Sequence, residues 1–356
     1  AHNGETRSLS LLGIAKKLGS KIGEPLIFDH IISEKDRIFR LPLTINQLEK
    51  ITIDWGDGTV EEIENKDNMF LLRTIIIHEY PDPSVSSEIK KYRVSIYGDE
   101  YSVKHVGYCQ NWADRITDFI TLGNLGITDL SGLFCNCGKF NGRLSENFDT
   151  ARIKNMSQMF CGAINFNQPL NFDTGNVTDM SYMFSHATSF NRILNWDTVN
   201  VRDMRRMFSN AVRFNQPFVV GKYWNTENVK HMESMFSNAR NFNQILNFNT
   251  INVTNMSYMF WCASNFNQPL NFNTKNVRNM KSMFNSAASF NQPLNFDTEN
   301  VTDMGHMFFC AFNFNQILNF NIVNVTNIKH MFDCATRFNQ ALNWKPKFST
   351  VGNLDL

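Results

Sequence analysis

One stretch of the sequence decides the fold: Phe190-Asn191-Arg192-Ile193-Leu194-Asn195-Trp196-Asp197-Thr198-Val199-Asn200-Val201-Arg202-Asp203-Met204-Arg205-Arg206-Met207-Phe208. Close variants of it recur through residues 133–344, and the Phe of the Met-Phe pair that closes each copy marks the repeat. These marker residues are Phe160, Phe184, Phe208, Phe236, Phe260, Phe284, Phe308 and Phe332. The step is 24 residues (184 − 160), except for one step of 28 (236 − 208) that holds an insertion around 219–223. A constant period of this length predicts a solenoid, in which each repeat buries its apolar face against its neighbours.

The apolar positions within one repeat predict a helix followed by a short strand. The helical stripe comprises Val177, Met180, Met183, Phe184, Ala187 and Phe190, with Asn176 placed to cap the first turn. The strand precedes this stripe and follows the helix expected in the preceding copy. Its alternation directs Leu170 and Phe172 inward and leaves Asn171 and Asp173 outward. We therefore expect an α/β solenoid with one short parallel strand and one helix in each 24-residue coil.

Asparagine columns on this solenoid predict two different roles. The first column is expected to satisfy backbone groups at the turn, each amide bonding the next coil, and comprises Asn167, Asn191, Asn215, Asn243, Asn267, Asn291, Asn315 and Asn339. The outward strand positions offer a neutral, hydrogen-bonding surface to a protein or glycan. These candidate binding residues are Asn171, Asp173, Asn195, Asp197, Asn247, Asn271 and Asn295.

The insertion in the 28-residue step supports two interpretations. Val219, Val220, Tyr223 and Trp224 could project as an aromatic binding site. Alternatively, the insertion is a tolerated loop, and Trp224 takes the place of the usual strand aromatic in the core. Both interpretations predict that the loop leaves the repeat intact.

The first part of the chain differs from the repeats. Residues 25–101 alternate in the manner of β-strands, which we expect at 37–43, 50–55, 72–78 and 92–97. Residues 102–132 read as degenerate coils that cap the solenoid at 133–344, and residues 345–356 form a tail. The Trp55-Gly56-Asp57-Gly58 turn, His78-Glu79-Tyr80 and the closing strand at 92–97 resemble PKD-like, immunoglobulin-type β-sandwiches. Asp54 and Asp57 suit turn capping better than Ca²⁺ binding, because two carboxylates are too few for a calcium site.

Residues 1–24 predict a short basic amphipathic segment. Leu11, Ala15, Leu18 and Ile22 share one helical face, and the neighbouring lysines lie largely off it. Such a segment packs on its own domain, stays disordered, or docks on a membrane or a neighbouring subunit. The sequence from Ala1 shows no signal region, so we expect that a signal was removed or that none existed.

Composition argues against several classes of function. Lys and Arg number 34 against 33 Asp and Glu, and this net charge of +1 gives no reason to expect nucleic acid as a partner. No apolar run is long enough to span a membrane. Cys262, Cys310 and Cys334 share one repeat position with Gly162, Asn210 and Ser286, so we expect small residues there rather than a metal site.

The repeat pattern Phe-Asn-Gln-Pro-Leu-Asn-Phe-Asp-Thr, as at 166–174, resembles BspA-like surface leucine-rich-repeat proteins. The resemblance implies surface attachment or protein binding, and it implies no catalytic residue or cofactor. We find no nucleophile motif, phosphate loop or clustered histidines, and therefore expect a protein that is not an enzyme. We predict an interaction or adhesion module exposed on a cell surface or virion. The alternative is a structural component of a large assembly, docked through residues 1–24.

Overall fold

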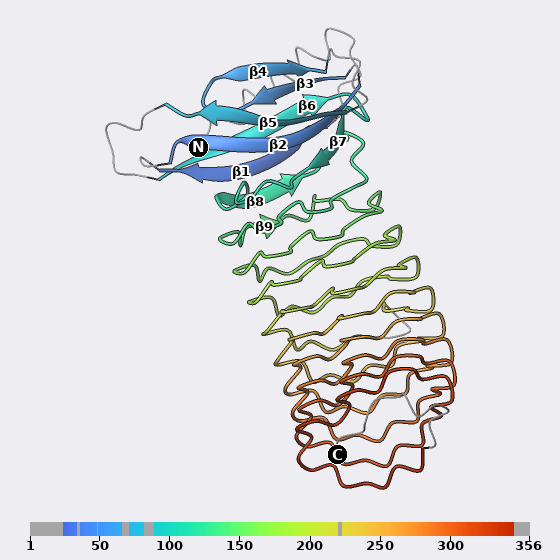
Figure 1. The fold of residues 1–356 in the computed structure, drawn as a ribbon. Helices are drawn as coiled ribbons and strands as arrows, with labels where there is room; N and C mark the ends of the chain where they lie inside the picture. Colours follow the sequence, from blue (N-terminus) through green and yellow to red (C-terminus); the bar gives the residue numbers. More distant parts are fainter. Residues whose placement is uncertain are drawn as a thin grey trace. The chain divides into compact units, whose positions relative to one another are not determined.

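The computed structural model describes residues 24–344 apart from 34–35, 48, 66–70, 82–88 and 220–222. The chain divides into two compact units, Ala1–Asn155 and Met156–Leu356. Figure 1 shows strands in the first unit and a series of stacked coils in the second. The predicted amphipathic segment (apart from residue 24) and the predicted tail at 345–356 lie outside the described residues.

The first unit contains two β-sheets. One sheet has the order β4-β3-β6-β1-β8-β9 and the other β5-β2-β7. Their pairs are antiparallel except for β8 and β9. The strands predicted at 37–43, 50–55, 72–78 and 92–97 are confirmed by β2, β3, β5 and β6. The strand bounds are β1 Leu26–Ile32, β2 Ile38–Asn46, β3 Lys50–Asp54, β4 Val60–Glu64, β5 Leu71–Glu79, β6 Lys90–Gly98, β7 Val103–Val106, β8 Ile116–Thr121 and β9 Arg143–Leu144.

Aromatic side chains fill the core of this unit. The His30 ring lies against Phe39, with centroids 4.3 Å apart, and its Nε2 is 2.7 Å from the Tyr80 hydroxyl. Burial lowers the pKa of His30 to about 3, so the ring is neutral at physiological pH. Trp55, which is fully buried, stacks on His78 at 4.5 Å. The two sheets therefore share a close-packed aromatic interior.

The two aspartates near Trp55 cap turns. The Gly56 N–H donates to Asp54 Oδ1 at 2.9 Å, and the Thr59 N–H donates to Asp57 Oδ1 at 2.9 Å. Asp57 Oδ2 also lies 2.9 Å from His78 Nε2, and hydrogen bonds from Thr59 and His78 lower the Asp57 pKa against the opposing effect of burial. These carboxylates serve the backbone and His78, as their sequence positions favoured.

The second unit overturns the predicted α/β solenoid, because the described part of the chain contains no helix. The reason lies in the backbone at Tyr182 and His186, which have φ of 57° and 60°. Two left-handed residues only four positions apart interrupt any right-handed helix. The same two positions are left-handed throughout the described coils of this unit: Gln158, Tyr182, Arg206, Ser234, Tyr258, Ser282, His306 and His330, and Gly162, His186, Asn210, Asn238, Cys262, Ser286, Cys310 and Cys334.

Backbone hydrogen bonds in this stretch alternate between the next coil and the same coil. The Tyr182 N–H donates to Arg205 O at 2.8 Å, whereas the Ser185 N–H donates back to Tyr182 O at 3.0 Å. Alternate N–H groups therefore form parallel bonds between coils, and those between them close three-residue turns. These turns direct Met180, Met183 and Phe184 inward at spacings that mimic a helical stripe, which explains the wrong prediction.

The predicted strand at 170–173 is also wrong as an element of secondary structure, although its pattern of burial is correct. Leu170 and Phe172 are buried, and Asn171 and Asp173 are exposed. One parallel bridge, Leu246–Leu270, lies at the predicted strand position. The bridges that recur from coil to coil lie at another position of the repeat, in the pairs Asp179–Asp203, Asp203–His231, His231–Asn255, Asn255–Asn279, Asn279–Asp303 and Asp303–Asn327. Each coil is thus a series of tight turns held to its neighbours by short parallel pairings.

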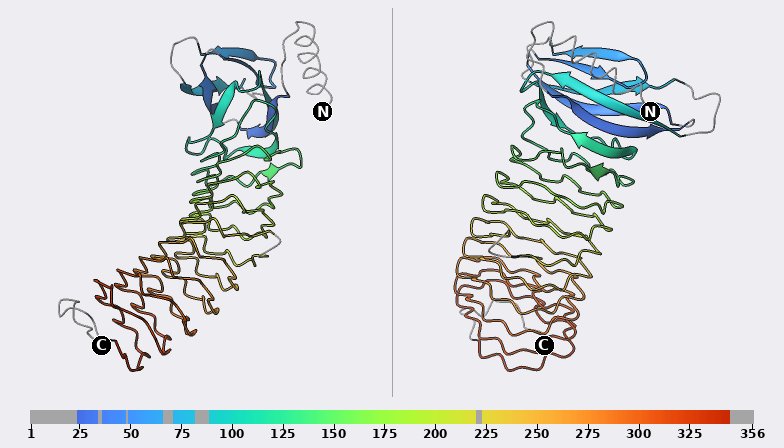
Figure 2. Two further views of the ribbon diagram at one scale, coloured as in Figure 1. Left: turned by 90° about the vertical axis from the view of Figure 1, so that its right-hand side faces the viewer. Right: turned by 180° about the vertical axis from the view of Figure 1, so that it is seen from behind.

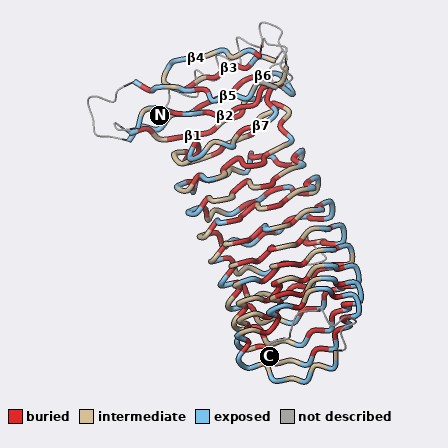
Figure 3. The backbone as a smooth tube through the Cα atoms, viewed as in Figure 1, coloured by how far each residue is buried: buried red, intermediate tan, exposed pale blue. Residues whose placement is uncertain are grey.

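Stacked phenylalanines form the core of the coils. The ring of Phe260 lies 5.9 Å from that of Phe236 and 5.6 Å from that of Phe284, with nearly parallel planes. Within its own coil it stacks on Phe266 at 4.1 Å. Figure 3 shows the buried residues continuing from coil to coil, with the exposed residues mainly at the turns. Further views show successive coils repeating the same course (Figure 2). The period in the sequence thus follows from identical layers in the core.

The left-handed positions make a stability prediction. Ser282 has φ 54°, so Ser282→Gly should relieve backbone strain and raise the free energy of unfolding by about 0.5–1 kcal/mol. Ser289, in the next turn, does not have a positive φ, so Ser289→Gly should lower the free energy of unfolding by a similar amount. Urea denaturation of both variants checks this. Equal midpoints for the two variants would contradict the role assigned to φ.

Candidate binding surfaces

The first asparagine column forms a continuous series of hydrogen bonds along the second unit. Asn243 Oδ1 accepts the Asn267 N–H at 3.0 Å, and Asn267 Oδ1 accepts the Asn291 N–H at 2.9 Å. The same bond recurs from Asn167 to Asn339 through Asn191, Asn215 and Asn315. The glutamine that follows several of these residues adds a second donor, as when Gln292 Nε2 bonds Asn267 Oδ1 at 3.2 Å. Because these side chains are only partly exposed and already engaged, the column belongs to the scaffold.

The predicted outward positions lie on the surface. Asn171, Asn195, Asn247, Asn271 and Asn295 are all exposed, one in each of five coils. Their neighbours Asp173 and Asp197 are exposed too, but each accepts a backbone N–H two residues later, from Gly175 and Val199 respectively. The row therefore offers amide groups to a ligand, whereas the aspartates also cap turns.

The insertion is only partly available to a partner. Trp224 is fully buried, its Nε1 donates to Leu194 O at 2.8 Å, and its ring packs edge-on against Phe218 at 4.5 Å. Trp224 therefore takes the core position of the strand aromatic, as one of the two interpretations held, and is unavailable as a surface anchor. Val219 is exposed and Tyr223 half-buried, whereas Val220 lies outside the described residues.

A different surface combines three residues at left-handed positions with a nearby tryptophan. We call Tyr182, Arg206, Tyr258 and Trp261 the aromatic face. The Arg206 guanidinium lies 5.4 Å from the centre of the Tyr182 ring, a cation–π contact between adjacent coils. Trp261 is 38% exposed, unusually high for so large an apolar side chain. The backbone conformation thus brings these residues to the surface in successive layers.

A shallow cavity of about 270 Å³ opens on the aromatic face. Ser209, Ser234 and Ser237 contribute hydroxyl groups to its lining, and Asn210 contributes an amide. These join Arg206, Tyr258 and Trp261, so the cavity combines flat aromatic rings with hydrogen-bonding groups. A small ligand with one apolar face and polar edges would match this lining.

The charges beside this cavity are largely paired. The Arg205 Nε lies 2.8 Å from Asp203 Oδ2, and 3.8 Å from Glu233 Oε1. The hydrogen bonds to Asp203 raise the pKa of the Arg205 guanidinium. Its positive charge is therefore balanced within the layer, whereas Arg206, which lines the cavity, lies against the Tyr182 ring.

Reasoning from the sequence missed the aromatic face. The predicted helix placed this column on its solvated side, so Arg206 was regarded only as an exposed basic residue, and Tyr182 and Tyr258 were not considered as a binding surface. One signal in the sequence could have revealed this face, namely a repeat position whose residue varies from coil to coil. The residue after Met-Ser or its equivalent differs between coils, being Tyr182, Arg206, Ser234, Tyr258, Ser282, His306 and His330, whereas the core positions beside it hardly change. Variable positions on a constant frame are typical of a recognition surface.

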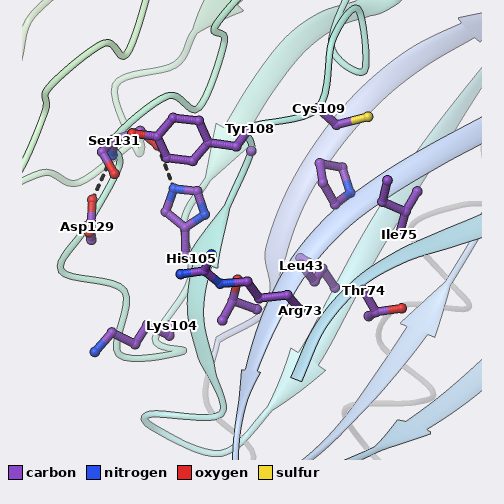
Figure 4. Close-up of a pocket in the computed structure, with 13 residues that line it drawn as sticks. Leu43, Arg73, Thr74, Ile75, Lys104, His105, Tyr108, Cys109, Asp129 and Ser131 are labelled. Carbon is purple, nitrogen blue, oxygen red and sulfur yellow. Dashed lines mark hydrogen bonds between the residues drawn. The ribbon is translucent and has the colours of Figure 1, made fainter. Parts of the chain in front are cut away.

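A larger cavity, of about 640 Å³, lies in the first unit (Figure 4). Arg73, Lys104 and His105 give it a basic character, and Tyr108 stacks on His105 at 5.1 Å. His105 Nε2 lies 2.5 Å from Ser131 O, so this ring is engaged with the backbone. The Asp129 carboxylate accepts the Ser131 N–H at 2.8 Å, which holds the adjoining turn. The lining suits an anion more than a catalytic reaction, since the charged groups near His105 are positioned by backbone contacts.

Two histidines that the sequence analysis regarded as scattered are in fact neighbours. The rings of His306 and His330 lie 5.0 Å apart, and burial together with His330 lowers the pKa of His306. Burial and the adjacent Cys334 raise the pKa of Cys310 to about 11, so its thiol is protonated at neutral pH. Within the described residues, no group of three or more His, Cys, Asp or Glu side chains could hold a metal ion.

Comparison with known proteins identifies the repeats. A family described as "Mycoplasma protein of unknown function, DUF285" matches residues 128–246, 192–271, 218–319 and 270–355. Neither a curated protein nor a solved structure matches the chain. Among the described residues, no helix has the length and apolar character needed to cross a membrane.

Proposed function

We propose a binding function for this chain, which belongs to the family described as "Mycoplasma protein of unknown function, DUF285". The chain would act as an interaction module without catalytic activity, and its ligand would be a glycan held on the aromatic face. The observation that carries the proposal is the exposed Trp261 beside a cavity with hydroxyl and amide groups in its lining.

The chemistry of a sugar ring complements this lining. A pyranose has a face of C–H groups and a rim of hydroxyl groups, so it stacks on a flat aromatic ring and forms hydrogen bonds at its edges. Trp261 and Tyr258 supply the rings, and Ser209, Asn210 and Ser237 line the same cavity. Asn210 Nδ2 donates to Ser209 Oγ at 3.2 Å, and Asn210 Oδ1 accepts from Asn238 Nδ2 at 2.5 Å, so these groups would bind a sugar hydroxyl through their remaining donor and acceptor positions. Arg206 also lines the cavity, and its guanidinium adds further donors for the hydroxyl groups of a sugar.

The proposal also includes a role for the BspA-like and PKD-like resemblances. We infer that the repeats act like those of BspA-like surface proteins, and that the preceding module is the PKD-like companion of such repeats. Support comes from the exposed amide row at Asn171, Asn195 and Asn247, which extends the area available to a long ligand. A location on a cell or virion surface follows from the same inference.

Replacing Trp261 tests the proposal. Trp261→Ala should weaken binding to a glycan by at least tenfold, because a central aromatic anchor typically contributes about 2 kcal/mol or more. The measurement is a screen of the full chain on an array of neutral oligosaccharides, followed by calorimetric titration of the best binder into both proteins.

The control is Phe312→Ala, which removes an exposed aromatic residue from a different column, 47% accessible to solvent. It should leave glycan affinity unchanged. The glycan proposal would be refuted if no oligosaccharide on the array bound the chain, or if Trp261→Ala and the wild type bound with equal affinity. Co-purification with a structural protein would then favour the alternative of an assembly component.

A further inference from the structure

The edge strand β5 presents an apolar surface that the glycan proposal does not use. Among the described strands, β5 pairs only with β2 in the sheet β5-β2-β7. Its side chains alternate, so Arg73, Ile75, Ile77 and Glu79 lie on the exposed face. Ile75 is 51% and Ile77 61% exposed, which is high for isoleucine in a strand.

The backbone of β5 is also available along this edge. The Tyr80 N–H donates to Arg37 O at 3.0 Å, in line with the register that pairs Ile38 with Glu79. In an antiparallel pair, alternate residues direct both N–H and C=O toward the same neighbour. The backbone groups of Arg73, Ile75, Ile77 and Glu79 therefore point away from β2.

The edge of the other sheet is built differently. β4 is five residues long and carries Glu61, Glu62 and Glu64, and Glu62 pairs with Lys50 at 2.7 Å. Charges on a short edge strand discourage pairing with another chain. β5 is nine residues long and has three consecutive isoleucines at its centre, so it lacks this protection.

We propose that β5 pairs antiparallel with β5 of a second copy of this chain, about a twofold axis at Ile76. The sequence of the strand is self-complementary in this register. Arg73 of one copy lies opposite Glu79 of the other, and Ile75 lies opposite Ile77, and each pair occurs twice. Opposite charges and branched apolar residues directly across an antiparallel pair are the combinations that stabilise it.

This match selects a second copy over an unrelated strand. A parallel in-register pairing would place Arg73 opposite Arg73 and Glu79 opposite Glu79. Glu79 Oε1 already lies 2.9 Å from Arg37 Nη2, but the Glu79 side chain is 61% exposed and that of Arg37 32%, so solvent weakens this ion pair and leaves Glu79 able to accept a second cation. The dimer is independent of the glycan proposal, because the aromatic face lies in the other unit.

Light scattering after gel filtration of the full chain, over a range of concentrations, tests the proposal. The wild type should be a dimer, and Ile77→Lys should raise the dissociation constant at least tenfold by placing a charge opposite Ile75. The matched control is Ile193→Lys, which changes an isoleucine 54% exposed in the second unit and should remain dimeric. Circular dichroism must show that each variant is folded.

A charge exchange tests the register itself. Arg73→Glu should raise the dissociation constant, since the introduced carboxylate would oppose Glu79 of the second copy in each of the two pairs. Combining Arg73→Glu with Glu79→Arg in one chain should restore the dimer, because the cross-strand pairs again have opposite charges. A monomeric wild type, a dimer insensitive to Ile77→Lys, or a double variant that stays monomeric would each overturn the proposal.

Discussion

Phe260→Ala should lower the free energy of unfolding by about 3–5 kcal/mol, the largest effect we expect from any single substitution. Phe260 is fully buried and stacks on Phe266 in its own coil at 4.1 Å. It also stacks on Phe236 and Phe284 in the coils on either side. Removing the ring leaves a cavity shared by three layers, none of which can collapse without moving the next.

Urea denaturation followed by tryptophan fluorescence and circular dichroism measures this loss. Phe312→Ala is the control, since Phe312 is 47% exposed and its removal should change the free energy of unfolding by less than about 0.5 kcal/mol. Equal destabilisation by the two variants would show that the phenylalanine stack does not hold the coils together. Because each coil contacts only its neighbours, the loss at Phe260 should also appear as reduced amide protection in residues 232–290 first.

Asn267→Ala should lower the free energy of unfolding by about 1–3 kcal/mol, because it leaves a half-buried backbone N–H without its acceptor. Asn267 Oδ1 accepts the Asn291 N–H at 2.9 Å and Gln292 Nε2 at 3.2 Å. Asn267→Asp keeps the acceptor oxygen and should lose less. The measurement is the same urea denaturation applied to both variants.

Asn271→Ala provides the matched control within the same coil. Asn271 is exposed, so its removal should leave the denaturation midpoint nearly unchanged. A midpoint for Asn267→Ala equal to that for Asn271→Ala would refute a scaffold role for the asparagine column.

The sequence was informative where physical requirements repeat. The period of 24 residues located the stacked phenylalanines of the repeats, and the position of Asn267 and its equivalents pointed to bonds between coils. Alternation located β2, β3, β5 and β6 for the same reason, since one face of each strand packs in the core. The tight turn at Gly56, with φ of 80°, was recognisable because few other residues adopt that conformation.

The helix could not have been rejected from apolar spacing alone. Turns of three residues and turns of an α-helix both return a side chain to the same side after three or four positions, so Met180 and Phe184 fit either structure. The decisive signal was weaker, namely Gly162 and Asn210 at a position also held by Cys262 and Ser286. That position requires a left-handed φ rather than a small side chain, and glycine and asparagine adopt such a φ most readily.

The wrong helix prediction also explains why the aromatic face was missed. Once Arg206 was assigned to a helix, no argument placed it in one cavity with Tyr258 and Trp261. That arrangement depends on the left-handed backbone at Arg206, Ser234 and Tyr258, which the sequence encodes only indirectly. The self-complementary β5, by contrast, can be read from the sequence as soon as the strand is known to be an edge.

The uniform bonding between layers also bears on how such a protein changes over generations. Removing or duplicating one whole 24-residue period joins two layers that already carry the same donors, acceptors and stacked rings, as Phe260 with Phe284 and Phe284 with Phe308 illustrate. Recombination between copies therefore alters the length of the array without creating a new junction. It also reassorts which of Tyr182, Arg206 and Trp261 stand next to one another, so the recognition surface can diversify while the interior stays the same.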